Sequence, residues 1–232
     1  MSLKQLTIEV PNVGPVTGLS MTPVHPIACY VLAHGAGAGM RHKFIEAVAS
    51  GLAERDIATL RFQFPYIERG LKRPDRPVVA MATVRAAVSA AHRSHTDLPL
   101  VAGGKSFGGR MTSEAQAAEP LPGVRGLAFM GFPLHPAGKP STSRADHFKR
   151  VKVPMLFLQG TRDALADVPL LNEVVEQLGL STKVIWLQDA DHSFQVPARC
   201  GRTNAEVLND VLNALREWIK VVVANADSAS GG

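Results

Sequence analysis

Gly103-Gly104-Lys105-Ser106-Phe107-Gly108-Gly109 is the stretch that decides the fold, because it joins an apolar extended run at residues 98–102 to a helix-compatible run at residues 111–118. A serine at the tip of so tight a turn needs small neighbours, and Gly104 and Gly108 stand two positions before and after Ser106. This Gly-x-Ser-x-Gly spacing is typical of a strand–turn–helix that lifts the serine hydroxyl above the end of a sheet. The sequence therefore predicts a nucleophile elbow at Ser106.

Two nucleotide-binding patterns also use glycine-rich turns. A Walker-type phosphate loop ends in Gly-Lys-Ser, as residues 104–106 do, but it requires a glycine where this chain has Pro99. A dinucleotide fingerprint beginning at Gly35 requires a glycine where the chain has Met40, and an acidic residue where it has Arg61. Both interpretations rank well below the nucleophile elbow.

Length and composition favour one domain. The chain has 232 residues, of which 46% are hydrophobic, so it can bury a large core, and we expect a single domain at residues 1–226. The small, polar residues 227–232 are expected to form a disordered tail. The net charge of +5 is scattered along the chain, which admits an anionic partner and argues against a nucleic-acid-binding arm.

The two cysteines and the N-terminus indicate a location. Cys29 and Cys200 are too few for a disulfide framework, and reduced thiols fit the cytoplasm. The first residues do not form the hydrophobic core of a signal peptide, and the longest apolar runs are shorter than the ~20 residues of a membrane span. We therefore expect a soluble, cytoplasmic protein without a membrane partner; the sequence does not specify its oligomeric state.

Apolar extended runs alternate with amphipathic helical runs along the chain. Strands are expected at residues 6–10, 16–21, 27–33, 56–62, 98–102, 124–130, 153–159 and 183–187, and helices at residues 41–55, 78–95, 111–118, 169–178 and 204–223. Residues 65–77 are expected to be a loop, and residues 131–150 a connection too short for a separate cap domain. This order predicts the α/β class: a mostly parallel central sheet with helices on both faces.

Polar partners for Ser106 follow two later strands. Asp163 comes just after the strand at 153–159, and His192 just after the strand at 183–187. Because the carboxyl ends of parallel strands share one edge of a sheet, the three side chains are expected to meet. His192 would act as the base and Asp163 would orient it, with Asp189 and Asp191 as fallback acids.

Further site residues are expected around this edge. The backbone N–H groups of Phe107 and Ala36 are predicted to form an oxyanion hole. The neighbouring loops contribute the candidate substrate contacts His34, Gly35, Arg41, Lys105 and His135. Three of these have a simpler explanation: His34 holds the oxyanion turn, His135 packs, and Lys105 faces other loops. The sequence contains no metal-ligand set and implies no cofactor.

Six segments together resemble the alpha/beta-hydrolase superfamily. Within that superfamily they are most similar to the small, cap-less dienelactone-hydrolase-like group. They are residues 34–40, 60–66, 103–111, 131–136, 159–163 and 191–194. The resemblance implies the alpha/beta-hydrolase fold and a serine hydrolase that acts on small esters or lactones through an acyl-enzyme. The nucleophile position is Ser106 and not the cysteine of dienelactone hydrolase, so that enzyme's lactone is not carried over.

Other functions stay open at this stage. The group is also similar to chromatin acetyltransferase (NSL) complex subunit 3-like proteins, which implies that the scaffold can serve as an interaction module without turnover. An acyltransferase or a peptidase could use the same three side chains. The pocket is expected to be shallow and open. A cluster of basic residues near it is more simply explained as a solvated basic face, with a preference for carboxylate-bearing substrates as the alternative: Arg41, Lys43, Arg69, Lys72, Arg73 and Arg76.

Overall fold

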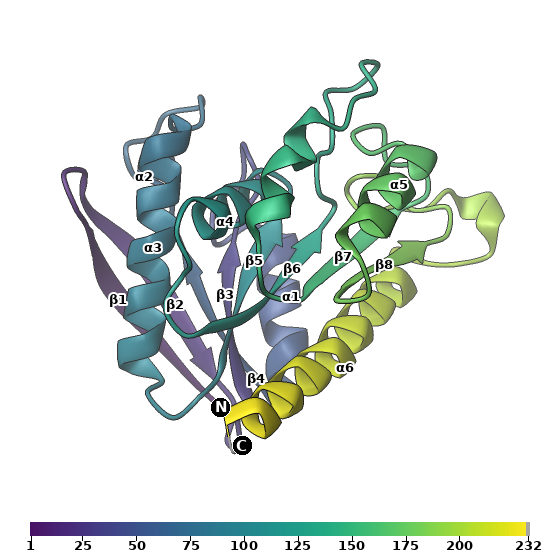
Figure 1. The fold of residues 1–232 in the computed structure, drawn as a ribbon. Helices are drawn as coiled ribbons and strands as arrows, with labels where there is room; N and C mark the ends of the chain where they lie inside the picture. Colours follow the sequence, from purple (N-terminus) through teal and green to yellow (C-terminus); the bar gives the residue numbers. More distant parts are fainter. Residues whose placement is uncertain (231–232) are drawn as a thin grey trace.

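The central sheet has eight strands in the order β1-β2-β4-β3-β5-β6-β7-β8 in the computed structural model, which describes residues 1–230 (Figure 1). The strands are β1 Ser2–Val10, β2 Gly14–Thr22, β3 Ala28–Ala33, β4 Ile57–Phe62, β5 Leu100–Lys105, β6 Val124–Met130, β7 Met155–Gly160 and β8 Thr182–Leu187. The first two strands form an antiparallel hairpin, and β2 pairs antiparallel with β4. The pairs from β4 to β8 are parallel, which confirms the predicted mostly parallel sheet.

The sequences of the central strands suit a parallel sheet, because they are apolar enough to be buried on both faces. Every residue of β3, β4 and β7 is buried. Alternate side chains of β3 enter two separate cores: Val31 packs in one and Leu32 in the other. Such strands have no face to offer to water, so helices must cover both sides.

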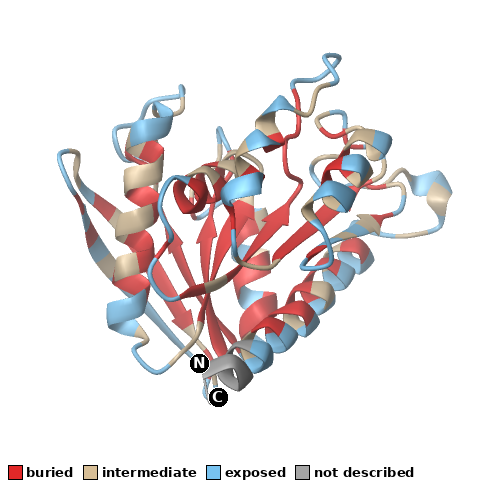
Figure 2. Cartoon of the chain, in the orientation of Figure 1, coloured by how far each residue is buried: buried red, intermediate tan, exposed pale blue. Residues whose placement is uncertain are grey.

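The helices are divided between the two faces as predicted. They are α1 Lys43–Ala53, α2 Pro65–Glu68, α3 Pro77–Ser94, α4 Phe107–Ala118, α5 Val168–Leu178 and α6 Asn204–Ser230, with the 3-10 helices η1 Ser143–Arg150 and η2 Ala198–Cys200. One core contains residues of α1 and α6, and the other contains residues of α3, α4, α5 and η1. Figure 2 shows the buried residues concentrated on the sheet and on the helix sides that meet it. Within residues 1–230, the helices lack the combination of length and apolar character that crossing a membrane requires.

Three segments differ from the expected elements. The predicted loop at 65–77 begins with α2, because Pro65 occupies the first helical turn and Asp75 accepts a hydrogen bond from the Tyr66 backbone N–H at 2.9 Å. The connection at 131–150 contains η1. Helix α6 extends beyond residue 223 to Ser230. The tail predicted to be disordered, residues 227–232, therefore overlaps the last turn of α6 and otherwise lies outside the described residues. Its disorder stays a prediction.

Replacement of Leu215 by Ala should destabilise the protein by about 2–5 kcal/mol, because this fully buried side chain of α6 packs in the core that α6 shares with α1. Val221 lies on the same helix and is 52% exposed, so Val221→Ala should change the free energy of unfolding by less than about 1 kcal/mol. Urea unfolding of both variants checks this. Equal losses would contradict the packing of α6 described here.

Candidate active site

Ser106 occupies a strained turn between β5 and α4. Its φ of 50° lies in the left-handed region, and its backbone N–H donates to the Met130 carbonyl at the end of β6, at 3.1 Å. A Cβ added to Gly104 would lie 2.2 Å from the Ala33 carbonyl oxygen, and one added to Gly108 would lie 2.5 Å from that of His34. The glycines on both sides of Ser106 are therefore required by the close approach of β3 and the loop after it.

His192 lies between Ser106 and Asp163. Its Nε2 is 2.9 Å from Ser106 Oγ, and its Nδ1 is 2.7 Å from Asp163 Oδ2. The Asp163 side chain is fully buried, whereas that of His192 is 26% exposed. With Nδ1–H donating to Asp163, Nε2 is free to accept the Ser106 hydroxyl proton. Ser106, His192 and Asp163 follow three separate strands and are thus joined by two consecutive hydrogen bonds.

Asp163 is held by further hydrogen bonds. Its Oδ1 accepts from the Leu165 backbone N–H at 2.8 Å, and its Oδ2 accepts from Gln159 Nε2 at 2.5 Å. Gln159 in turn accepts from the Phe132 backbone N–H at 2.8 Å. The fallback acid Asp191 accepts from backbone N–H groups of its own loop, including that of Ser193 at 2.8 Å. The sequence did not indicate that Gln159 holds Asp163, because this role depends on contacts with the segments that carry Phe132 and Asp163.

The loop between β3 and α1 lies beside the elbow. A Cβ at Gly35 would be 3.7 Å from Ser106 Cβ. Phe107 is the first residue of α4, so its N–H lacks an acceptor within the helix. Within the part of the chain that the structure describes, neither this N–H nor that of Ala36 has a protein acceptor. Both N–H groups therefore remain without a partner among the described residues.

Residues of β4 and of the segment after it hold this loop in place. The Tyr66 hydroxyl accepts from the Gly37 backbone N–H at 3.1 Å, directly after Ala36. The Gln63 side chain accepts from the Met40 N–H at 2.8 Å, and the buried Arg61 donates to the Met40 carbonyl at 3.1 Å. The sequence includes these residues only within the segments 34–40 and 60–66 that resemble the alpha/beta hydrolases. It does not predict their contacts, because these depend on β4 lying beside β3.

His34 is a buried anchor of the same loop. Its Nδ1 lies 2.9 Å from the Gly35 carbonyl oxygen, and its Nε2 accepts from the Phe64 backbone N–H at 3.1 Å. Burial lowers its pKa to about 4, so the ring is neutral at pH 7 and can both donate and accept. It acts on the loop and does not line the cavity.

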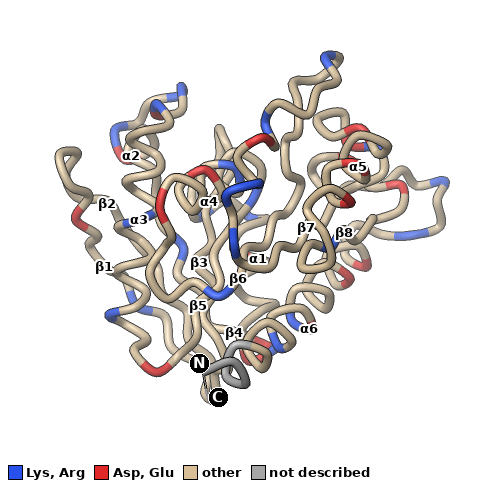
Figure 3. The backbone as a smooth tube through the Cα atoms, in the orientation of Figure 1, with Lys and Arg blue, Asp and Glu red and all other residues tan. Residues whose placement is uncertain are grey.

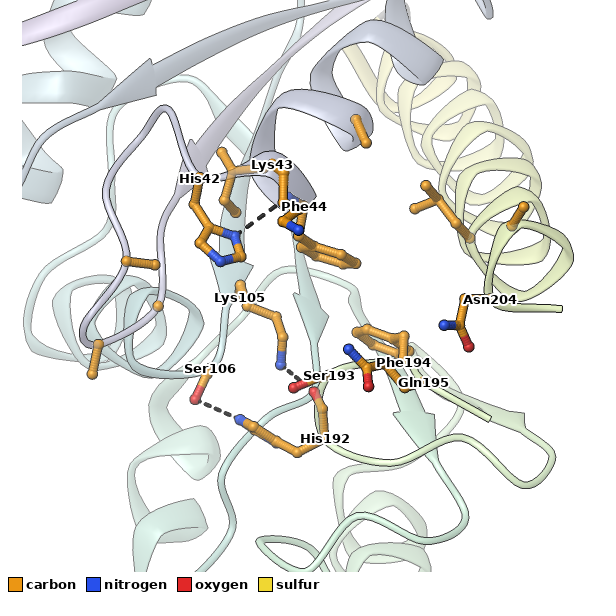
Figure 4. Close-up of a pocket in the computed structure, with 17 residues that line it drawn as sticks. His42, Lys43, Phe44, Lys105, Ser106, His192, Ser193, Phe194, Gln195 and Asn204 are labelled. Carbon is orange, nitrogen blue, oxygen red and sulfur yellow. Dashed lines mark hydrogen bonds between the residues drawn. The ribbon is translucent and has the colours of Figure 1, made fainter. Parts of the chain in front are cut away.

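A cavity of about 700 Å³ opens beside Ser106 and His192 (Figure 4). Its walls include the stacked rings of Phe44 and Phe194, whose centroids are 5.6 Å apart. The other lining residues come from the loop after β3, α1, the elbow, the loop after β8 and the start of α6: Gly35, Ala36, Ala38, His42, Lys43, Ile45, Ala47, Lys105, Ser193, Gln195, Asn204, Ala205 and Leu208. Among the described lining residues there are two lysines and no Asp or Glu.

The expected substrate contacts divide into two groups. Gly35 and Lys105 line the cavity, whereas Arg41 and His135, like His34, are absent from its described lining. Arg41 donates instead to the Gln5 side-chain oxygen at 3.5 Å. His135 is buried, and its Nε2 accepts from the Asp167 backbone N–H at 2.9 Å, which anchors the start of α5.

The expected basic cluster contributes one side chain to the cavity, Lys43. Arg41 lies in the loop between β3 and α1, and the other four are exposed around α2 and the loop after it (Figure 3), where Arg69 donates to the Val13 carbonyl at 3.3 Å. Among the side chains that the structure describes, no group of three or more His, Cys, Asp or Glu could hold a metal ion.

The model of the alpha/beta hydrolase domain family matches residues 26–220. The chain belongs to this family. Solved structures of hydrolases superimpose on nearly all of it. A dienelactone hydrolase from Anabaena variabilis matches with a TM-score of 0.74 and 20% identity, over 94% of this chain and 97% of that one.

Two further structures support the same fold for this alpha/beta hydrolase. A serine hydrolase without lid from Xanthomonas campestris matches with a TM-score of 0.71 and 22% identity, over 94% of this chain and 95% of that one. Est1E from Butyrivibrio proteoclasticus matches with a TM-score of 0.72 and 15% identity, over 95% and 99%. These likenesses confirm the alpha/beta-hydrolase fold; in the described residues the β6–β7 connection contains η1 and no separate cap domain.

The stability of this hydrolase should fall as the pH drops from about 6.5 toward 4. The neutral form of His34 is favoured in the folded state, so its contribution is complete above the ordinary pKa of 6.5 and is lost as the pH approaches about 4; the loss is up to roughly 3 kcal/mol. Urea unfolding across this range should give a shallower pH dependence for His34→Gln than for the wild type. His147, whose pKa burial also lowers to about 4, should contribute separately, so His147→Gln is the matched comparison. An unchanged slope in His34→Gln would contradict the assignment.

Proposed function

We propose that this alpha/beta hydrolase is a serine hydrolase that cleaves small esters or lactones through an acyl-enzyme on Ser106. The observation that supports this most directly is the position of the His192 imidazole, 2.9 Å from Ser106 Oγ and 2.7 Å from Asp163 Oδ2. A serine hydroxyl is a poor nucleophile until a neighbouring base takes its proton, and His192 lies where that base is needed.

The first half of the reaction forms the acyl-enzyme. Ser106 Oγ attacks the carbonyl carbon while its proton moves to His192 Nε2, and the carbonyl electrons move to the oxygen. The buried Asp163 carboxylate stabilises the imidazolium that results. When the tetrahedral intermediate collapses, the C–O bond to the alcohol breaks, and His192 returns the proton to the leaving oxygen.

Water completes the cycle by the same steps. His192 takes a proton from a water molecule, the hydroxide attacks the acyl carbon, and the bond to Ser106 Oγ breaks as the serine regains its proton. Both tetrahedral intermediates carry a negative oxygen, and the N–H groups of Phe107 and Ala36 are the proposed donors to it. Removing one such donor typically costs about 3–4 kcal/mol of barrier.

The cavity suggests the class of substrate. A volume of about 700 Å³ suits a small molecule, and the Phe44 and Phe194 rings offer an apolar wall. Lys43 and Lys105 give the cavity a positive charge that favours esters or lactones bearing a carboxylate. Both cysteines are free, in accord with a proposed place of action in the cytoplasm.

Reaction with a fluorophosphonate probe should label Ser106. The wild type should be modified, Ser106→Ala should not, and Ser94→Ala, which removes an exposed serine at the end of α3, should react as the wild type does. Asp163→Asn should lower kcat for short p-nitrophenyl esters by roughly 10⁴-fold, because an amide cannot stabilise the imidazolium.

The alternatives have distinct outcomes. If the folded wild type is neither labelled nor active on esters, the protein is better explained as an interaction module on a hydrolase fold. If it is labelled but transfers the acyl group to an added amine or alcohol more efficiently than to water, it is an acyltransferase. Release of amines from peptides in place of alcohols from esters would identify a peptidase.

The carboxylate preference is tested with two esters of equal chain length. At low salt, kcat/KM for p-nitrophenyl hemisuccinate should exceed that for p-nitrophenyl butyrate by roughly threefold to tenfold, and the ratio should fall as salt is added. Lys43→Met should reduce the ratio without reducing turnover of the butyrate ester in proportion. A ratio near one in the wild type at low salt would reject the preference.

A further inference from the structure

Lys105 directly precedes Ser106, and its side chain crosses to the loop that carries His192 (Figure 4). Its Nζ donates to the His192 backbone carbonyl at 2.5 Å and lies 5.2 Å from the centroid of the Phe194 ring. The side chain is half-buried although it carries an ammonium group. A buried cation is costly without partners, so these two contacts account for its position.

Gly131, at the end of β6, leaves the space that Lys105 occupies. A Cβ at this position would lie 2.7 Å from Lys105 Nζ and 3.4 Å from His192 Cε1. The φ of Gly131 is 63°, a conformation that glycine adopts readily. The elbow, the end of β6 and the His192 loop therefore meet at the ammonium group.

The rest of the His192 loop is held by its own contacts and by bonds to other elements, such as that from the Arg162 backbone N–H to the Ala190 carbonyl at 2.9 Å. Asp191 accepts from Ser193 and Gln195, and the Phe194 N–H donates to the Asp191 carbonyl at 3.0 Å. These bonds shape the loop, and the Asp163 carboxylate binds the His192 ring. The bond from Lys105 adds a direct tie between the residue before the nucleophile and the backbone of the base.

We propose that Lys105 is a positioning residue, whose charge-assisted hydrogen bond to the His192 carbonyl holds the imidazole over Ser106. The inference rests on the proposed serine-hydrolase function. It assigns Lys105 a role that does not require contact with substrate, although the side chain also lines the cavity. Small displacements of a catalytic group can cost about a hundredfold in rate, so one such bond can matter.

The charge of Lys105 responds to its surroundings. Burial lowers its pKa to about 8, and the carboxylates of Asp163 and Asp191 partly oppose this change. The other titratable groups that face it are the His192 imidazole and, across the cavity, His42 and Lys43. A neutral amine makes a weaker hydrogen bond than an ammonium group, so the tie should weaken as the pH rises through about 8.

The test measures kcat and KM of Lys105→Met on the neutral p-nitrophenyl butyrate. Methionine keeps most of the apolar stem but cannot donate, and Lys152→Met, at an exposed position, controls for loss of a lysine. We expect kcat to fall roughly 10- to 100-fold while KM changes less than about twofold. Rates are normalised to the sites titrated by a fluorophosphonate, so that misfolded protein does not count.

The pH profile supplies the second readout. In the wild type, kcat should decline as the pH rises from about 7 to about 9.5, and this decline should be absent in Lys105→Met. Lys105→Arg, which stays charged over this range, should keep more activity than Lys105→Met and should lack the decline as well.

The outcomes separate this inference from the proposed function. A wild type that is neither labelled nor active rejects the function itself. If the wild type is active, the positioning role is overturned by an unchanged kcat in Lys105→Met, by a change confined to KM for the hemisuccinate ester, or by a basic decline that persists in Lys105→Met. Should Lys105→Met fail to fold, a wild-type kcat that does not decline between about pH 7 and 9.5 overturns it.

Discussion

The close approach of β3 to the turn after β5 is the constraint on which the rest of the site depends. The backbone at Gly104 and Gly108 lies so close to Ala33 and His34 that no side chain would fit at either glycine. Ser106, between them, is held with a φ of 50°. This contact fixes the serine hydroxyl at the carboxyl edge of the parallel strands, next to the loop that bears Ala36. Residues after β7 and β8 reach the same edge because those strands run parallel to β5.

Burial and charge are distributed unevenly around this edge. Asp163 is fully buried and receives hydrogen bonds from Gln159, Leu165 and His192, which compensate its loss of hydration. Burial keeps His34 neutral, and its ring bonds to backbone groups. Lys105, in contrast, is an ammonium group beside the proposed nucleophile at neutral pH. The cavity is therefore lined by the imidazoles of His42 and His192 and by two lysines, an environment suited to developing negative charge.

Much of this arrangement could be predicted from the chain. The strands and long helices follow from apolar periodicity, and the elbow follows from glycine spacing, because both are local properties. The structure also brings Ser106, Asp163 and His192 together, as their places after three separate parallel strands predict. Local pattern did not reveal that His135 anchors α5 or that Arg41 contacts Gln5, since both depend on how loops pack.

The sequence by itself determined the α/β architecture, the turn at Ser106 and the order of its partners along the chain, because periodicity, glycine placement and chain order are readable without coordinates. Only the tertiary structure decided which side chains line the cavity and which hold its loops. Tyr66, Gln159 and Lys105 act on residues that are distant in sequence or in neighbouring loops, through single hydrogen bonds. Such bonds depend on ångström-scale distances between separate segments, which no local pattern encodes.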